Sequence, residues 1–238
     1  MVERGLVPSR EKAQALIMAG QVVVDDHAAE KAGQQVTDTV TIRIKGEQMP
    51  YVSRGGLKLE KGLDAFGVDP AGRIAIDVGA STGGFTDCLL QRGAAKVYAV
   101  DVGYGQLAWK LREDPRVVVL EKTNIRHLQQ DQLDPLPDLA VIDASFISLN
   151  LVLPSTVALL SHPAELVALI KPQFEVGKGA VGKGGIVRDP RQHEAVLFAM
   201  EQLAADIGAE LLGICDSPIT GADGNREFLM GLRVGVPV

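Results

Sequence analysis

The sequence predicts an α/β chain, with a doubly wound parallel sheet preceded by a small α+β module. From residue 73 onward, short apolar runs alternate with stretches of helical spacing, which is typical of parallel strands joined by helices. The 238 residues are 46% hydrophobic, enough for one full core and a smaller module. The first 45 residues differ, because their pattern predicts one helix followed by short strands.

The N-terminal module is predicted from its capping and turn residues. Ser9 can cap a helix that runs to about Gly20, a natural C-terminal stop. The apolar runs at 22–24 and 40–44 predict two strands. Residues 46–53 then predict a linker that contains a proline. We therefore expect two domains, residues 1–48 and residues 49–238.

The larger domain is predicted from alternating apolar runs and helical stretches. The predicted parallel strands are 73–78, 96–101, 117–121, 139–143 and 165–170. The predicted helices between and after them are 83–92, 106–112, 151–160 and 191–207. Two late strands, at 209–215 and 228–234, are joined by a glycine-rich turn, so we expect a hairpin at the edge of the sheet.

Charge and composition exclude several classes of protein. The net charge of −6 argues against a globally basic nucleic-acid binder, although residues 1–58 carry eight Lys and Arg against seven Asp and Glu. The four histidines are isolated and the two cysteines lie far apart, so we expect no metal site. The chain shows no apolar signal segment and no run approaching a membrane span, which predicts a cytoplasmic protein without stable membrane association.

A glycine-rich turn follows the first strand of the larger domain. Gly79, Gly83 and Gly84 would let a ligand approach the backbone closely. Asp101 ends the next strand, where a carboxylate can accept both hydroxyls of a ribose. The G-x-x-x-G-G spacing differs from that of dinucleotide enzymes, and Asp77 suits a cationic cofactor without phosphate. We therefore expect a nucleoside cofactor here; the alternative is a tight turn that binds nothing.

Four charged residues stand at the ends of predicted elements: Lys58, Asp143, Lys171 and Glu227. Asp143 and Lys171 end parallel strands, and ligands of doubly wound sheets collect at those ends. A hydroxyl nucleophile needs a group that takes its proton, and burial or a second cation makes a lysine a better base. Lys171 could act as this base, tuned by Lys58 and positioned by the two carboxylates. The alternative is a set of surface ion pairs, and spacing alone does not choose between them.

At these residues the chain resembles the TlyA-type proteins, a family known both as haemolysins and as rRNA 2′-O-methyltransferases. It is also similar to the wider FtsJ-like methyltransferases. The matching strings follow the family's order and together span nearly the whole chain: residues 52–59, 77–87, 143–149, 170–175 and 221–228.

The resemblance implies a Rossmann-like methyltransferase sheet that uses S-adenosylmethionine to methylate a ribose 2′-hydroxyl of rRNA, with cytidine as the expected nucleoside. It places the family's catalytic tetrad on Lys58, Asp143, Lys171 and Glu227. It places the cofactor on Asp77, Gly79, Ser81, Gly83, Gly84, Phe85, Asp101 and Asn124.

The N-terminal segment is similar to the S-four RNA-binding domain, through residues 4–10 and 19–25. The expected partner is RNA, either rRNA or ribosomal subunits, held by salt-sensitive phosphate contacts. The expected RNA-binding residues are Arg4, Arg10, Lys12, Gln21 and Arg54. Family members begin with several more residues, so we expect a shortened module that binds RNA more weakly.

Three other functions stay open at this point. A haemolysin-like, membrane-active protein would explain one of the family's names. A non-catalytic RNA-binding or ribosome-assembly factor would need the RNA-binding module but no base. A nicotinamide-dependent oxidoreductase would share the fold, but the spacing of the glycine-rich turn disfavours it.

Overall fold

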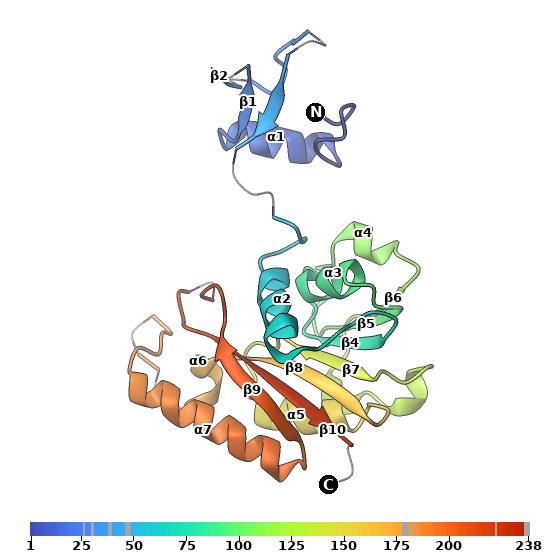
Figure 1. Ribbon diagram of the computed structural model, residues 1–238, viewed down its shortest axis with the longest axis vertical. Helices are drawn as coiled ribbons and strands as arrows, with labels where there is room; N and C mark the ends of the chain where they lie inside the picture. The colour runs from blue at the N-terminus through green and yellow to red at the C-terminus, as the bar shows by residue number, and fades with distance from the viewer. Residues whose placement is uncertain are drawn as a thin grey trace. The chain divides into compact units, whose positions relative to one another are not determined.

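The computed structural model describes residues 1–25, 27–29, 31–37, 40–45, 49–177, 181–182, 184–221 and 223–235. These residues form two compact units, Met1–Pro50 and Tyr51–Val238, which Figure 1 shows as ribbons. Each unit has its own sheet. Part of the predicted linker, residues 46–48, lies outside the described residues.

The smaller unit contains one helix and a three-stranded antiparallel sheet. Its elements are α1 (Arg10–Met18), β1 (Val22–Val24), β2 (His27–Ala28) and β3 (Ile42–Ile44), and β1 pairs with both other strands. Ser9 caps α1, since its side chain accepts a hydrogen bond of 3.2 Å from the backbone N–H of Lys12. The predicted helix and its two strands are therefore confirmed, whereas β2 was not expected.

The larger unit is built on a seven-stranded sheet in the order β6-β5-β4-β7-β8-β10-β9. Its strands are β4 (Ile74–Val78), β5 (Lys96–Val100), β6 (Val117–Leu120), β7 (Leu139–Ile142), β8 (Ala164–Ile170), β9 (Glu210–Asp216) and β10 (Phe228–Val234). The sheet is parallel except that β10 runs antiparallel to both β8 and β9. The predicted α/β class, parallel sheet and edge hairpin are confirmed.

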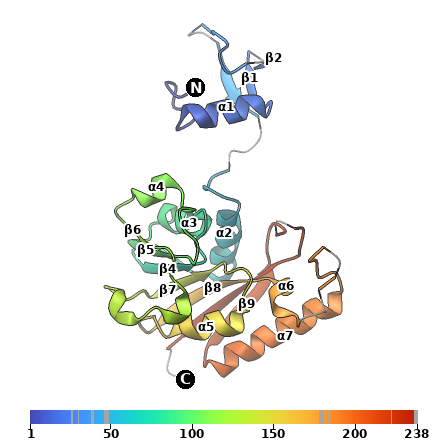
Figure 2. The same cartoon turned by 180° about the vertical axis from the view of Figure 1, so that it is seen from behind.

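Helices cover both faces of this sheet. They are α2 (Gly55–Phe66), α3 (Gly84–Gln91), α4 (Trp109–Arg112), α5 (Leu149–Val157), α6 (Pro172–Glu175) and α7 (Pro190–Asp206), with short 3-10 turns η1 (Ile125–His127) and η2 (Gln130–Gln132). Figures 1 and 2 show α2, α3 and α4 on one side of the sheet and α5 and α7 on the other. Because strand side chains alternate, Ala75 joins the core under α2 and α3, whereas Ile76 joins the core on the opposite face.

Helix α2 was not predicted from the sequence, because it opens with two glycines and an N-cap, Arg54, whose side chain makes no capping bond. Packing explains it instead. Leu59 and Leu63 are fully buried against the sheet. Gly62 lies so close to β8 that a Cβ there would be 2.8 Å from a methyl of Val167. Burial of this face therefore stabilises a helix that local propensity does not favour.

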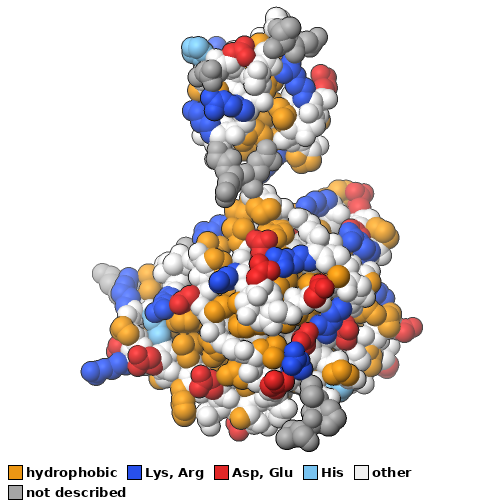
Figure 3. Space-filling model, viewed as in Figure 1, with side chains coloured by type: hydrophobic (Ala, Val, Ile, Leu, Met, Phe, Trp, Pro, Cys, Tyr) orange, Lys and Arg blue, Asp and Glu red, His pale blue; other side chains and the backbone are white. Residues whose placement is uncertain are grey.

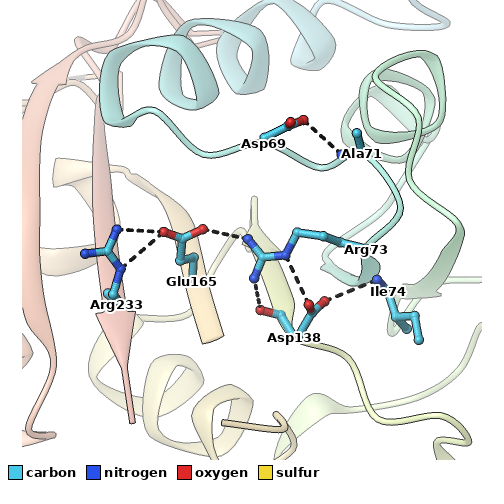
Figure 4. Close-up of polar contacts among 7 residues, drawn as sticks. All are labelled: Asp69, Ala71, Arg73, Ile74, Asp138, Glu165 and Arg233. Atoms are coloured by element: carbon cyan, nitrogen blue, oxygen red, sulfur yellow. Dashed lines mark hydrogen bonds and ion pairs between the residues drawn. The ribbon is translucent and has the colours of Figure 1, made fainter. Parts of the chain in front are cut away.

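A network of charges joins four strands at the amino-terminal edge of the parallel sheet (Figure 4). Arg73 donates to Asp138 and, at 2.6 Å, to Glu165. Glu165 also accepts a bond of 2.9 Å from Arg233. This network ties β4, β7, β8 and β10 together at the edge opposite their parallel carboxyl ends, so we assign it a role in stability.

Candidate active site

The candidate site lies at the carboxyl edge of the parallel strands. Strands β4, β7 and β8 end at Val78, Ile142 and Ile170, and their parallel pairing brings these ends to one edge. Strand β10 is antiparallel, so its first residue, Phe228, pairs with Ile170 at this same edge. Loops distant in sequence therefore meet here, as expected for an open α/β sheet.

The glycines of the turn after β4 permit close approach between backbones. Gly79 has φ of 87° and Gly83 has φ of 98°, a region that favours glycine. A Cβ at Gly79 would lie 2.8 Å from the backbone oxygen of Asp143, so this turn packs directly on the end of β7. A Cβ at Gly83 would meet the side chain of Leu111 at 2.3 Å. Gly79 therefore shapes the cavity below, whereas Gly83 serves the packing of α4.

Asp77, the last acidic residue of β4, is fully buried beneath this turn. One carboxylate oxygen accepts a bond of 2.6 Å from the hydroxyl of Thr86, and the other has no hydrogen-bond partner among the described residues. The pKa of Asp77 is raised to about 7, mainly by burial and also by the nearby carboxylates of Asp143 and Asp101, although the Thr86 bond lowers it. The free oxygen fits a cationic donor, directly or through water.

One cavity of about 440 Å³ opens between the ends of β4, β5 and β7. Predicted cofactor residues that line it are Gly79, Ser81, Asp101 and Asn124. The carboxylate of Asp101 accepts the backbone N–H of Ser81 at 2.8 Å and that of Gly103 at 2.6 Å. These bonds fix the carboxylate at the cavity wall and leave acceptor capacity for ribose hydroxyls.

A second cavity of about 390 Å³ lies between the start of α2 and the glycine-rich turn. Arg54, Lys58, Gly84 and Phe85 line it. It shares three wall residues with the first cavity: Gly79, Ser81 and Asp143. The two cavities are therefore neighbours, one on the side of Asp101 and the other on the side of Lys58.

The first of two ion pairs at this edge joins Lys58 of α2 to Glu227. Their charged atoms lie 2.6 Å apart, and the Glu227 side chain is 3% exposed. Glu227 immediately precedes β10, which explains why a residue far along the chain reaches this edge. Gly221 covers the carboxylate so closely that a Cβ there would lie 2.5 Å from one of its oxygens.

The second ion pair joins Lys171, at the end of β8, to Asp143, at the end of β7, with 2.6 Å between charged atoms. Lys171 is buried and Asp143 partly exposed. Lys58 and Asp143 both line the second cavity, so both pairs border the same space. The structure thus brings the four predicted residues together as two ion pairs.

Sequence reasoning missed other polar residues of this edge. Thr86 bonds to Asp77, and Gln106 accepts a bond of 3.1 Å from the hydroxyl of Ser81. Ser145 lies 2.7 Å from the ammonium of Lys171. The signal for Ser145 was present, because it stands two residues after Asp143 at the end of a parallel strand.

The predicted RNA-binding residues fall on both units. Arg10, Lys12 and Gln21 are exposed on the smaller unit. Arg4 uses its guanidinium inside that unit, donating to the backbone oxygens of Val40 and Thr37. Arg54 borders the second cavity and donates to the backbone oxygen of Thr220 at 3.2 Å. Figure 3 shows acidic and basic side chains interspersed on the visible face of the larger unit.

A sheet with one antiparallel strand next to its outer edge, an acidic residue under a glycine-rich turn and a second acid after β5 together define an S-adenosylmethionine-dependent methyltransferase. Comparison with known families agrees with this class. The model of FtsJ-like methyltransferases matches residues 51–234, and that of the S4 domain matches residues 1–42. The chain belongs to the FtsJ-like methyltransferase family.

Relatives match over almost the whole chain. Protein YqxC of Bacillus subtilis is 52% identical over 234 residues, which cover 98% of this chain and 83% of the relative. The 16S/23S rRNA (cytidine-2'-O)-methyltransferase TlyA of Mycobacterium tuberculosis is 49% identical over 98% of this chain and 87% of its own. Hemolysin A of Brachyspira hyodysenteriae is 43% identical over 94% of each chain.

Solved structures agree with the fold. A hemolysin candidate from Streptococcus thermophilus is 48% identical, covers 97% of this chain and 85% of its own, and superposes with a TM-score of 0.77. An S-adenosylmethionine-dependent methyltransferase from Mesorhizobium loti, 15% identical, covers 73% of this chain and 96% of its own with a TM-score of 0.53. In the part of the chain that the structure describes, no helix is long and apolar enough to cross a membrane.

Proposed function

We propose that this chain transfers the methyl group of S-adenosylmethionine to a ribose 2′-hydroxyl of ribosomal RNA, with cytidine as the target nucleoside. The observation that carries the proposal is the convergence of two lysines and two carboxylates beside the glycine-rich turn. Lys58 pairs with Glu227 and Lys171 pairs with Asp143, each at 2.6 Å, although the partners are far apart in sequence. Relatives that match 98% of the chain and are named rRNA cytidine methyltransferases support the choice of substrate.

The residues of the first cavity fit the methyl donor. Asp101 presents a fixed carboxylate to a ribose, and Asn124 presents a polar side chain after β6. The unpartnered buried oxygen of Asp77 fits the amino group of a methionine part, directly or through water. Gly79 lets the glycine-rich turn lie directly against the backbone of Asp143, because a Cβ there would be 2.8 Å from that residue's oxygen. When bound here, S-adenosylmethionine supplies an electrophilic methyl group.

The roles of the four charged residues follow from their contacts. Lys171 is buried and forms an ion pair with Asp143, which lines the cavity. Lys171 is therefore placed to take the proton of a hydroxyl nucleophile. Asp143 borders both cavities and orients Lys171. Lys58 adds a second positive charge to the site, and Glu227 holds that charge in place. Together they orient a hydroxyl and accept its proton.

RNA recognition would combine both units. The exposed residues Arg10, Lys12 and Gln21 offer phosphate contacts on the smaller unit, and Arg54 offers one beside the second cavity. Phosphate contacts of this kind weaken as salt rises. We propose ribosomal subunits as the partner and the cytoplasm as the place of action.

The proposal is tested with purified ribosomal subunits and S-adenosylmethionine that carries a labelled methyl group. Wild-type protein should label one subunit or both, while Lys58→Ala and Lys171→Ala should each lose at least about 100-fold in rate. Lys61→Ala is the matched control, since Lys61 is exposed on the same helix as Lys58, and it should keep the wild-type rate. Cofactor affinity, measured by calorimetry, should change by less than about threefold in all three variants.

The competing functions give different results in the same series. A membrane-lytic protein would release dye from liposomes and label no RNA. A non-catalytic assembly factor would bind subunits but transfer no methyl group with any variant. Labelling that survives Lys171→Ala at full rate would remove Lys171 from the mechanism.

A further inference from the structure

The ammonium of Lys171 is surrounded by three oxygen atoms. They are a carboxylate oxygen of Asp143 at 2.6 Å, the hydroxyl oxygen of Ser145 at 2.7 Å and the backbone oxygen of Asp143 at 3.4 Å. A lysine ammonium has three N–H donors and no acceptor. Two of the contacts are hydrogen bonds, to Ser145 and to the backbone oxygen of Asp143, and the contact with the carboxylate is an ion pair.

The three oxygens respond differently when Lys171 loses its proton. Neutral lysine has two N–H donors and one lone pair, so three hydrogen bonds can be kept only if one of the three partners becomes a donor. The carboxylate and the backbone oxygen of Asp143 can only accept. The hydroxyl of Ser145 can both accept and donate, so of these three groups it alone can donate a hydrogen bond to the lone pair of neutral Lys171.

The position of Ser145 also differs from that of Lys171. Lys171 is 7% exposed, whereas Ser145 is exposed and lines the cavity that Gly79 and Asp101 also line. The turn is fixed in an unusual conformation, since the next residue, Phe146, has φ of 64°. The hydroxyl therefore lies between the buried amine and the open cavity, within reach of a substrate that enters the cavity.

We propose that Ser145 is a further catalytic residue, which relays the proton of the ribose hydroxyl to Lys171. This inference rests on the proposed ribose methylation. The step starts with neutral Lys171, whose lone pair accepts the Ser145 O–H, while the Ser145 oxygen accepts the ribose 2′-O–H.

The electrons and protons of the step balance. The ribose oxygen uses one electron pair to form its bond to the methyl carbon, and the pair of the carbon–sulfur bond returns to sulfur. The ribose proton passes to the Ser145 oxygen as the Ser145 proton passes to Lys171. Ser145 ends neutral, and Lys171 ends as the ammonium whose three oxygen partners the structure records. Release of that proton to solvent restores the starting state.

The test compares wild type with Ser145→Ala and Ser145→Thr in single-turnover methylation of ribosomal subunits. Loss of the hydroxyl should slow the reaction by about 10- to 100-fold, and threonine, which restores a hydroxyl, should recover most of the rate. Rates measured in mixtures of H₂O and D₂O give a second readout. For wild type, the transfer of two protons predicts that the rate depends on the deuterium fraction along a curve. For Ser145→Ala, the transfer of one proton predicts that the rate changes along a straight line.

Binding measurements separate this role from a structural one. Calorimetry should show cofactor and subunit affinities within about threefold of wild type for Ser145→Ala. Ser155→Ala is the matched control, because its hydroxyl bonds only to the backbone oxygen of Leu151 on α5 among the contacts described, and it should keep the wild-type rate.

Three results would overturn the relay: full rate in Ser145→Ala, no recovery with threonine, or a slowed variant that keeps the curved deuterium dependence. If wild-type protein itself transfers no methyl group, the proposed function fails instead.

Discussion

The buried carboxyl group of Asp77 predicts a particular dependence of stability on pH. Burial raises its pKa from the ordinary 3.8 to about 7. An acid whose folded-state pKa is raised binds its proton more tightly in the folded state, so the folded protein loses stability as pH rises between these two values. The full difference between the two pKa values corresponds to a loss of unfolding free energy of at most about 4 kcal/mol, which relaxation and water penetration reduce.

The substitution Asp77→Asn removes this titration while keeping the shape of the side chain. Because all other groups titrate alike in both proteins, the difference between their unfolding free energies isolates Asp77. Without cofactor, the unfolding free energy of wild type should fall by about 1–3 kcal/mol relative to that of Asp77→Asn between pH 5 and pH 7. The difference between the two free energies should then stay constant from pH 8 to pH 9. Urea unfolding followed by circular dichroism measures both free energies.

Bound cofactor should reduce this loss of stability at high pH. A bound ammonium near Asp77 favours the charged carboxylate, so cofactor affinity of wild type should rise as pH increases through about 7. Asp77→Asn should bind more weakly and lack this rise. A stability gap that is the same at every pH would refute the reasoning, because Asp77 would then not titrate near neutrality in the folded protein.

Three further predictions concern other parts of the larger unit. Asp101→Ala should weaken cofactor binding by about 10- to 100-fold in calorimetry, since a fixed carboxylate acceptor is lost, and unchanged affinity would contradict the ribose contact. Gly221→Ala should slow methyl transfer without changing cofactor affinity, because its Cβ would lie 2.5 Å from a carboxylate oxygen of Glu227. Gly177→Ala is the control and should keep the wild-type rate, since no described atom lies within 4 Å of its Cβ. Equal rates in the two variants would contradict the contact between residue 221 and Glu227. Glu165→Gln should lower the unfolding free energy by about 1–2 kcal/mol through its two arginine partners and leave the transfer rate unchanged, and an unchanged melting temperature would contradict this role.

Most of the fold could be predicted from the sequence, because its strands are short apolar runs with clear turns between them. Continuous apolar runs were sufficient to predict β4, β7 and β8, whose residues are almost all buried. Helix α2 could not be predicted in this way. Its stability comes from the burial of Leu59 and Leu63 against a sheet whose strands all lie later in the chain.

The candidate site was partly predictable for a topological reason. Parallel strands bring their carboxyl ends together, so the proximity of Asp143 and Lys171 followed from the strand assignment. The Lys58–Glu227 pair did not follow from that rule, because α2 was missed and Glu227 precedes an antiparallel strand. The contact of Ser145 with Lys171 depends on side-chain placement within a turn, which residue spacing does not determine.

The central claim is that the methyl group goes to a ribose oxygen through the four charged residues at the carboxyl edge of the sheet. The most direct measurement is mass spectrometry of the nucleosides released from ribosomal RNA after incubation with the protein and labelled S-adenosylmethionine. Wild-type protein should yield labelled 2′-O-methylcytidine, and Lys171→Ala should yield almost none. A label on a base, or an equal yield from Lys171→Ala, would contradict it.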